Sequence, residues 1–320
     1  MTNAFASIKR HFRELVQGWD GFWFTPTDPA VLCAIRVAIG LLLLWTHLVW
    51  SFDLAAFFGP DGWVAPELAA ATHAGRMTAD VFPWLGGGGL LWTFHVLNLI
   101  AFLLLTLGWW SRTAAVWSYA AAVLYATHVT PGAFFGLDKI NCLLAMYVML
   151  GPCGARYSID SWLRRRRGET DERPPSVSAN IALRLLQLHL CVVYLFSGLG
   201  KLQGVRWWNG TATWFTVANP EYRSLDMTWM AEYLWFGELL THVTVFWELF
   251  YCAIVWPRLS RPWVLLTAIG VHGYIGVAMG MHEFALAMLV ANAAFLSPSF
   301  VRGVLDPIAR RIAGGPAEAD

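Results

Sequence analysis

The sequence predicts an all-α fold, a bundle of about eight membrane-spanning helices that follows a helix at the membrane surface. Of the 320 residues, 57% are hydrophobic and only 13% are charged, which excludes an ordinary soluble globular protein. Apolar runs recur along the chain at close to the ~20 residues that cross a membrane. Basic residues gather between these runs, as expected for loops on the cytoplasmic side.

Residues 1–24 are expected to form the surface helix. Lys9, Arg10 and Arg13 are interspersed with apolar residues at helical spacing, which are Ile8, Phe12, Leu15, Val16 and Trp19. This pattern is typical of an amphipathic helix that lies on a membrane. The segment has neither the apolar core nor the small-residue cleavage site of a signal peptide, so we do not expect one here.

Residues 25–300 are predicted to form one transmembrane domain, and residues 301–320 a cytoplasmic tail. Eight apolar stretches near the length of a span cover residues 30–50, 90–108, 113–129, 138–152, 180–199, 234–256, 263–279 and 283–296. The third, fourth and eighth are short, so the sequence defines their ends least well. A polar stretch at residues 164–176 is interpreted as a cytoplasmic linker and not as a domain boundary.

The basic residues also predict an orientation, because cytoplasmic loops carry the excess of lysine and arginine. They occur before the first span and after every second one, at Lys9, Arg10, Arg13, Arg112, Arg164 to Arg167, Arg258, Arg261, Arg302, Arg310 and Arg311. Eight spans with both termini in the cytoplasm fit this alternation. Lys201 then lies near the outer face. The exceptions, which fall on or near the outer side, are Arg76, Lys139, Arg206 and Arg223.

Composition and spacing exclude several classes of site. The net charge is only +1 and the basic residues are explained by topology, so we expect the lipid bilayer and no nucleic acid as a partner. The five cysteines lie in or beside apolar runs without a CxxC pair, which is typical of packing residues. Neither HxxxH nor HExxH occurs, and no metal site is predicted.

Six histidines lie within the predicted spans, at His47, His95, His128, His189, His242 and His272. The orientation places His47, His95, His128 and His242 towards the outer side, where they could line a polar cavity that binds a ligand. Alternatively, each one only hydrogen-bonds a neighbouring helix. Glu248 lies in the middle of the sixth span, where a carboxyl group needs a partner or a proton.

Lys201 closes the fifth apolar run and is the leading candidate for a functional residue. Tyr194, Ser197 and Lys201 are seven and four residues apart, so they share one face of a helix. Gly198 and Gly200 beside them allow close approach of another helix or of a flat ligand. A lysine that is partly removed from water can act as a base in its neutral form. The alternative is a lysine at a helix end whose charge reaches the headgroups.

Several segments resemble a known family. They include the start of the first span, with Asp28, Pro29 and Arg36, and the run "SGLGKLQG" at residues 197–204, which is followed by tryptophans and "NGT". Together the segments 26–44, 155–167, 183–215 and 261–300 resemble the membrane domain of vitamin K-dependent gamma-carboxylases. The chain is more closely similar to bacterial members of the HTTM (horizontally transferred transmembrane) family, over residues 22–300. This resemblance implies the inner membrane of a bacterium, with both termini in the cytoplasm.

This resemblance implies a reduced quinone, similar to vitamin K, as cofactor and a carboxylase-like, lyase-class reaction. Lys201 matches the lysine that deprotonates the quinol in the carboxylases, His272 matches a histidine of a late helix, and Arg36 matches an arginine of the first span. Where the carboxylases carry an active-site histidine, this sequence reads "LDKINCLL" from Leu137, so Asn141 would supply only part of its hydrogen bonding. We also expect no large lumenal domain of the kind that binds protein substrates.

Two function classes therefore remain open. In the first, the chain is a quinol-dependent enzyme with an outward-facing site, with Lys201 as base and with His272 and Asn141 as further catalytic candidates. In the second, it is a non-enzymatic membrane protein that binds a lipid, a peptide or a partner protein. Besides these, the candidate ligand-binding residues are Arg36, Tyr194, Ser197, His47, His95 and His242.

Overall fold

The computed structural model describes residues 2–73, 80–128, 136–169, 174–221 and 223–312. Within these ranges the chain is helical and forms no β-strand, which confirms the all-α prediction. Part of the predicted cytoplasmic tail, residues 313–320, lies outside the described residues, as do Arg76 and the side chain of Ile8.

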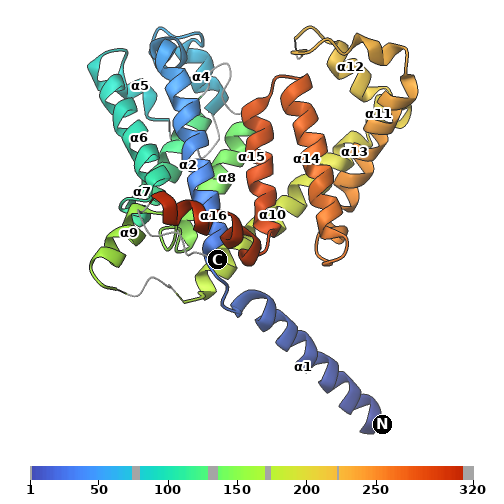
Figure 1. Ribbon diagram of the computed structural model, residues 1–320. Coiled ribbons are helices and arrows are strands. Elements are labelled where there is room, and N and C mark those ends of the chain that lie inside the picture. Colours follow the sequence, from blue (N-terminus) through green and yellow to red (C-terminus); the bar gives the residue numbers. More distant parts are fainter. Residues whose placement is uncertain (1, 74–79, 129–135, 170–173, 222, 313–320) are drawn as a thin grey trace.

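Each of the eight predicted spans is a helix in the structure. These helices are α2 (Ala30–Trp50), α6 (Gly89–Leu107), α7 (Ser111–Thr127), α8 (Gly136–Leu150), α10 (Val177–Lys201), α13 (Leu234–Ile254), α14 (Arg261–Ala278) and α15 (His282–Asn292). Figure 1 shows them running side by side as a bundle. Each helix begins and ends within a few residues of the predicted bounds, because the apolar runs are separated by glycine, proline and charged residues.

Helix length and hydropathy support fewer membrane crossings than the sequence pattern predicts. Three stretches of the described chain are long and apolar enough to cross a membrane, namely Ala30–Phe58, Gly89–Leu107 and Val177–Lys201. A fourth would be the pair His282–Phe295 and Pro298–Ile312, whose two helices are bent by 117°. The predicted count of eight spans is therefore not confirmed, although the helices that it requires are present.

Shorter helices cover the two ends of the bundle. At one end lie α3 (Leu54–Phe58), α4 (Pro66–His73), α5 (Phe82–Leu85), α11 (Val205–Trp208), α12 (Ala212–Ala218) and the 3₁₀ turns Ser51–Asp53 and Thr228–Ala231. At the other end lie α9 (Ile159–Arg166), α16 (Pro298–Ile312), which follows the 3₁₀ turn Ala293–Phe295, and the projecting helix α1 (Thr2–Phe24). The amide of Asn180 donates to the carbonyls of Phe22 and Trp23, both at 2.8 Å, and so holds the end of α1 against α10.

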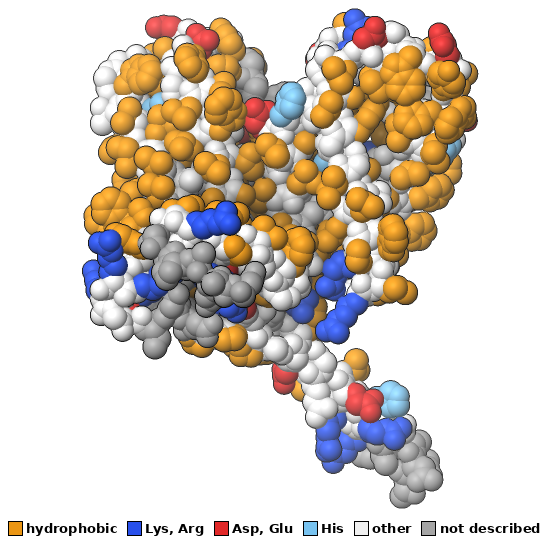
Figure 2. Space-filling model, in the orientation of Figure 1, with side chains coloured by type: hydrophobic (Ala, Val, Ile, Leu, Met, Phe, Trp, Pro, Cys, Tyr) orange, Lys and Arg blue, Asp and Glu red, His pale blue; other side chains and the backbone are white. Residues whose placement is uncertain are grey.

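The bundle has two lobes (Figure 1). Helices α2, α6, α7 and α8 form one, α10, α13 and α14 form most of the other, and α15 stands between them. Figure 2 shows hydrophobic side chains over the faces of both lobes and a recess between the lobes at the end that carries α4 and α12. Lysine and arginine side chains gather towards the opposite end. An apolar belt of this kind is suited to hydrocarbon and not to water.

Arg36 is fully buried in α2 and ties three parts of the chain together. Its guanidinium donates to the carbonyls of Leu105 and Thr106 at the end of α6 and to those of Cys153 and Tyr157 in the turn before α9. The last carbonyls of a helix have no partner within the helix, so this arginine satisfies groups that would otherwise be unpaired. The buried charge thus has a structural explanation.

At the same end, an ionic cluster fixes α16 to the start of α2. Arg156 and Arg302 both lie within 3.4 Å of a carboxylate oxygen of Asp28, and Arg302 also contacts Asp306. The Tyr157 hydroxyl donates to Asp306 at 2.7 Å. Burial, followed by the bond to Asp306, raises the pKa of Tyr157 above its usual value. Helix α16, which begins at Pro298, is thereby held across the end of the bundle.

Candidate functional site

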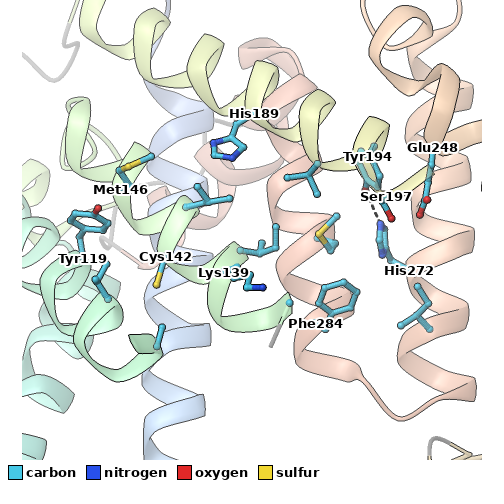
Figure 3. Close-up of a pocket in the computed structure, with 18 of the residues that line it drawn as sticks. Tyr119, Lys139, Cys142, Met146, His189, Tyr194, Ser197, Glu248, His272 and Phe284 are labelled. Carbon is cyan, nitrogen blue, oxygen red and sulfur yellow. Dashed lines mark hydrogen bonds between the residues drawn. The ribbon is translucent and has the colours of Figure 1, made fainter. Parts of the chain in front are cut away.

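The main cavity lies within the bundle and has a volume of about 670 Å³. Helices α7, α8, α10, α13, α14 and α15 all contribute to its wall, so it lies where the two lobes meet. Its lining is mostly apolar and includes Tyr119, Cys142, Met146 and Phe284 (Figure 3). Its polar side chains come mainly from α10, α13 and α14, whereas Thr127 lies on α7 and Lys139 on α8. This combination is typical of a site for a small, largely hydrophobic ligand.

Lys201 lies on the cavity wall and forms an ion pair with Glu248 of α13. Its Nζ is 2.6 Å from Glu248 Oε2 and 2.7 Å from Ser197 Oγ, one helical turn earlier. The Trp207 ring centroid lies 5.2 Å from the same nitrogen. The Lys201 side chain is 20% exposed and that of Glu248 is 8% exposed, so the pair is largely shielded from solvent. A charge pair at this depth is strongly coupled.

Close packing of two helices makes this pair possible. Gly198 lies against α13, where a side chain at that position would come within 3.0 Å of the Leu249 backbone nitrogen. Without the glycine, α10 could not approach α13 so closely, and Lys201 would not reach Glu248. Gly200, by contrast, has open space around it. Of the two roles considered for these glycines, helix packing explains Gly198.

A second polar group of the cavity surrounds Tyr194. The Tyr194 hydroxyl is 2.7 Å from His272 Nε2 and also 2.8 Å from the amide nitrogen of Asn292. Tyr251 donates to the other end of that amide, at 2.8 Å. His272 Nδ1 is buried and has no hydrogen-bond partner within the described chain. Tyr194 and His272 line the cavity, whereas Asn292 and Tyr251 lie behind them.

A smaller cavity of about 390 Å³ adjoins the main one. Both cavities are lined by Lys201, Glu248, Ile275 and Phe284, so the ion pair lies on the wall between them. The smaller cavity is otherwise lined by aromatic and aliphatic residues and by threonines, which are Thr213, Thr216, Thr244 and Thr267. Lys201 could therefore contact ligands on two sides.

The predicted site residues fall into two groups. Lys201, Tyr194, Ser197 and His272 are brought together at the main cavity, although the last comes from a different helix. The predicted residues that do not line it are Arg36, Asn141, His47, His95 and His242. Asn141 is buried on α8, and its side-chain oxygen has no partner within the described residues. It therefore lies near the cavity wall without forming part of it.

His47 and His95 belong to a separate aromatic cluster between α2, α6 and α7. His95 is 2.8 Å from both the Tyr125 hydroxyl and Ser51 Oγ, and His47 Nδ1 is 2.7 Å from the Leu43 carbonyl. These contacts are the hydrogen bonds between and within helices that were the alternative to a ligand site. His242, at the other lobe, lies 3.3 Å from the Trp208 carbonyl.

Three polar residues of this region were not among the site residues predicted from the sequence. Glu248 was recognised as needing a partner, but its partner lies 47 positions earlier in the chain. His189 lines the cavity and is bonded to the Tyr147 hydroxyl at 2.8 Å. Asn292 was missed altogether. An amide within an apolar helix is a usable signal, because such a group needs partners.

Comparison with known proteins gives one match. The model of the HTTM domain family matches residues 24–300, which is most of the chain. No curated protein and no solved structure matches.

Proposed function

Because the chain belongs to the HTTM domain family and its long helices are apolar enough to cross a membrane, we propose that this membrane protein is a quinol-dependent, carboxylase-like enzyme. The main cavity holds the reduced quinone, and Lys201 and Glu248 together act as the base. The observation that carries the proposal is the ion pair on the wall of a largely apolar cavity, where a lipid-soluble ligand can reach it.

The size and lining of the cavity support a flat, apolar ligand. Ligand pockets commonly measure ~300 to 1,000 Å³, and the main cavity falls within that range at about 670 Å³. Tyr119 and Phe284 offer aromatic surface to a ring, while Met146 and Met288 can adjust to its substituents. Tyr194, Ser197 and His272 lie at one end of the cavity with Glu248, and Lys139 and His189 lie nearer its middle (Figure 3). The polar group at the end suits the polar ring of a ligand that has an apolar remainder.

The proposed step is a proton transfer, for which the charges balance. A bound quinol would supply the proton from one of its hydroxyls and would keep the resulting negative charge. The pair of Lys201 and Glu248 has no net charge before this step, and after it gains the proton it carries one positive charge. The ammonium of Lys201 would then stabilise that negative charge, because opposite charges attract each other more strongly where water is excluded.

A second function is supported by the same contact. Because Lys201 and Glu248 join α10 to α13 and satisfy each other, they could serve only to hold the bundle together. The chain would then be a non-enzymatic membrane protein that binds a lipid, a peptide or a partner protein. The predicted Asn141 does not line the cavity, which agrees with this alternative, because the residue in place of the carboxylase histidine would then not contact a ligand there.

Exchange of the two charged residues distinguishes the functions. The double variant Lys201→Glu with Glu248→Lys keeps an ion pair between the helices but moves the ammonium to the other helix. If the pair is only structural, the double variant should behave like the native protein, whereas each single variant should be less stable. If the pair is the base, the double variant should be stable but unable to ionise the ligand.

The probe is 2-methyl-1,4-naphthohydroquinone, added without oxygen to protein in lipid nanodiscs. Ionisation of the bound hydroquinone shifts its absorption to longer wavelength. We expect the shift with the native protein, and not with the exchanged pair or with Lys201→Met. Mass spectrometry of lipids extracted from gently purified protein gives a second measurement. Native protein that neither retains a quinone nor ionises the probe would contradict the proposed function.

A further inference from the structure

Four buried polar side chains from four helices form a continuous chain of hydrogen bonds next to the main cavity. They are Tyr251 of α13, Asn292 of α15, Tyr194 of α10 and His272 of α14, and none is more than 4% exposed. Polar groups in such surroundings are expected to be fully paired, because an unpaired one costs its lost hydration. The direction of each bond in the chain can therefore be worked out.

The amide of Asn292 fixes the direction. Its nitrogen is 2.9 Å from the Met288 carbonyl oxygen and 2.8 Å from the Tyr194 hydroxyl. If the amide were turned over, its oxygen would face the Met288 carbonyl, which has no hydrogen to donate. The amide nitrogen therefore donates to Tyr194, and the amide oxygen accepts from the Tyr251 hydroxyl.

The tautomer of His272 follows from this direction. The Tyr194 hydroxyl accepts a hydrogen from Asn292, so its own single hydrogen points to the remaining neighbour, His272 Nε2, at 2.7 Å. Nε2 is then an acceptor without a hydrogen. In a neutral imidazole the hydrogen is therefore on Nδ1. This is the one nitrogen of the ring that has no partner within the described chain.

We propose that Asn292 and Tyr251 are positioning residues that hold His272 as an Nδ1–H donor, and that the ligand of the main cavity presents an acceptor oxygen to this donor. The assignment of the tautomer depends on the protein alone, whereas the acceptor oxygen rests on the proposed function, which places a ligand in this cavity. The chemical class is a carbonyl or an anionic oxygen on an apolar ring. A pure hydrocarbon would leave the donor unpaired.

The arrangement in the cavity agrees with this assignment. Figure 3 shows His272 at the same end of the cavity as Ser197 and Glu248, while Tyr119 and Met146 lie at the other end. A ligand oxygen at this end would be close to these polar side chains, and the rest of the ligand would extend past Lys139 and His189 to the apolar side chains at the other end. His272 would bind the ligand directly, whereas Asn292 and Tyr251 act through it.

The tautomer can be measured by nitrogen NMR of protein labelled with ¹⁵N-histidine, in nanodiscs, with His272→Gln to assign the signal. We expect the Nδ1–H form in the native protein. In Asn292→Asp the new side chain accepts the Tyr194 hydrogen, so the ring should change to the Nε2–H form. Tyr194→Phe removes the donor to Nε2 and serves as a second variant if Asn292→Asp does not fold. An Nε2–H ring in the native protein would overturn the inference.

Tyr147→Phe is the matched control. It removes the hydroxyl that is bonded to His189 at 2.8 Å. His189 lies on α10, as Tyr194 does, but it does not belong to the chain of four hydrogen-bonded side chains. The His189 signal should change and the His272 signal should stay as in the native protein. If Tyr147→Phe changes the His272 signal as much as Tyr194→Phe does, the signal reports general loosening of the bundle. The assigned chain of hydrogen bonds would then be wrong.

The acceptor oxygen is tested with two probes of the same shape. 2-Methyl-1,4-naphthoquinone carries two carbonyl oxygens, and 2-methylnaphthalene has the same ring without them. We expect the native protein to prefer the quinone, and Asn292→Asp to reduce that preference about tenfold, as expected for the loss of one good hydrogen bond. Equal preference in both proteins would overturn the acceptor assignment. If the native protein binds neither probe, the proposed function is refuted as well. The NMR measurement would still decide the tautomer of His272, because the tautomer depends on the protein alone.

Discussion

Replacement of Arg36 by methionine tests whether this charge, which is fully buried, is structural. The substitution keeps a long apolar side chain but removes the donor to four carbonyls. The Leu105 carbonyl keeps the bond from the Gly108 amide at 3.1 Å, so we expect three carbonyls to be left unpaired. At ~1 kcal/mol or more for each lost hydrogen bond, the native state should lose roughly 3 kcal/mol.

The assay is thermal unfolding in detergent, compared with Arg302→Met as a control. Arg302 lies in the ionic cluster at the same end of the bundle, but its side chain is 38% exposed and its pairs should contribute less than ~1 kcal/mol. We therefore expect a much lower midpoint for the Arg36 variant than for the control. The structural explanation would be refuted if Arg36→Met unfolded like the native protein and yet failed to bind a ligand, because Arg36 would then act as the ligand-binding residue that its motif predicts.

Three further predictions concern a glycine at a helix end, a buried thiol and the orientation of the chain. Gly108→Ala should strongly lower the midpoint of thermal unfolding, because Gly108 has a φ of 66° and an added Cβ would lie 2.4 Å from the Cβ of Ser158. The control Gly168→Ala has a φ of 77° but open space around it, so it should cost only about 1 kcal/mol of stability. Burial raises the pKa of Cys153 to about 12, so at pH 8 the thiol is protonated and should react with maleimide only after unfolding; labelling of the folded protein would contradict this. A reporter fused after Met230 should lie on the outer side, and a cytoplasmic signal there would disprove the predicted orientation.

The helices could be predicted from the sequence because each is a local pattern. The first span shows this most clearly, since the predicted residues 30–50 coincide with α2. Its start is marked by Asp28 and Pro29, whose effects act within one turn of the helix. The shared face of Tyr194, Ser197 and Lys201 is equally local, and these residues do line one cavity. Local patterns were sufficient wherever the relevant contacts lie within one helix.

Contacts between helices could not be predicted in the same way. Glu248 was recognised as a buried acid, but helical spacing carries no information on which lysine or histidine on another helix would reach it. The predicted layer of outer histidines illustrates the same limit, since His47 and His95 contact Tyr125 and do not face the cavity of Lys201. A shared depth in the membrane does not determine which way a side chain points around its helix.

The shortness of α15 has a consequence for access to the site. With 11 residues and a rise of ~1.5 Å per residue, this helix is about 16 Å long, roughly half of the ~30 Å of hydrocarbon in a membrane. Its connection to α14 lies between the two lobes (Figure 1), at the end of the bundle where Figure 2 shows the recess. A water-soluble reactant could therefore arrive through the recess while a lipid-soluble one enters from the bilayer. The two would meet at mid-depth without either crossing the whole membrane.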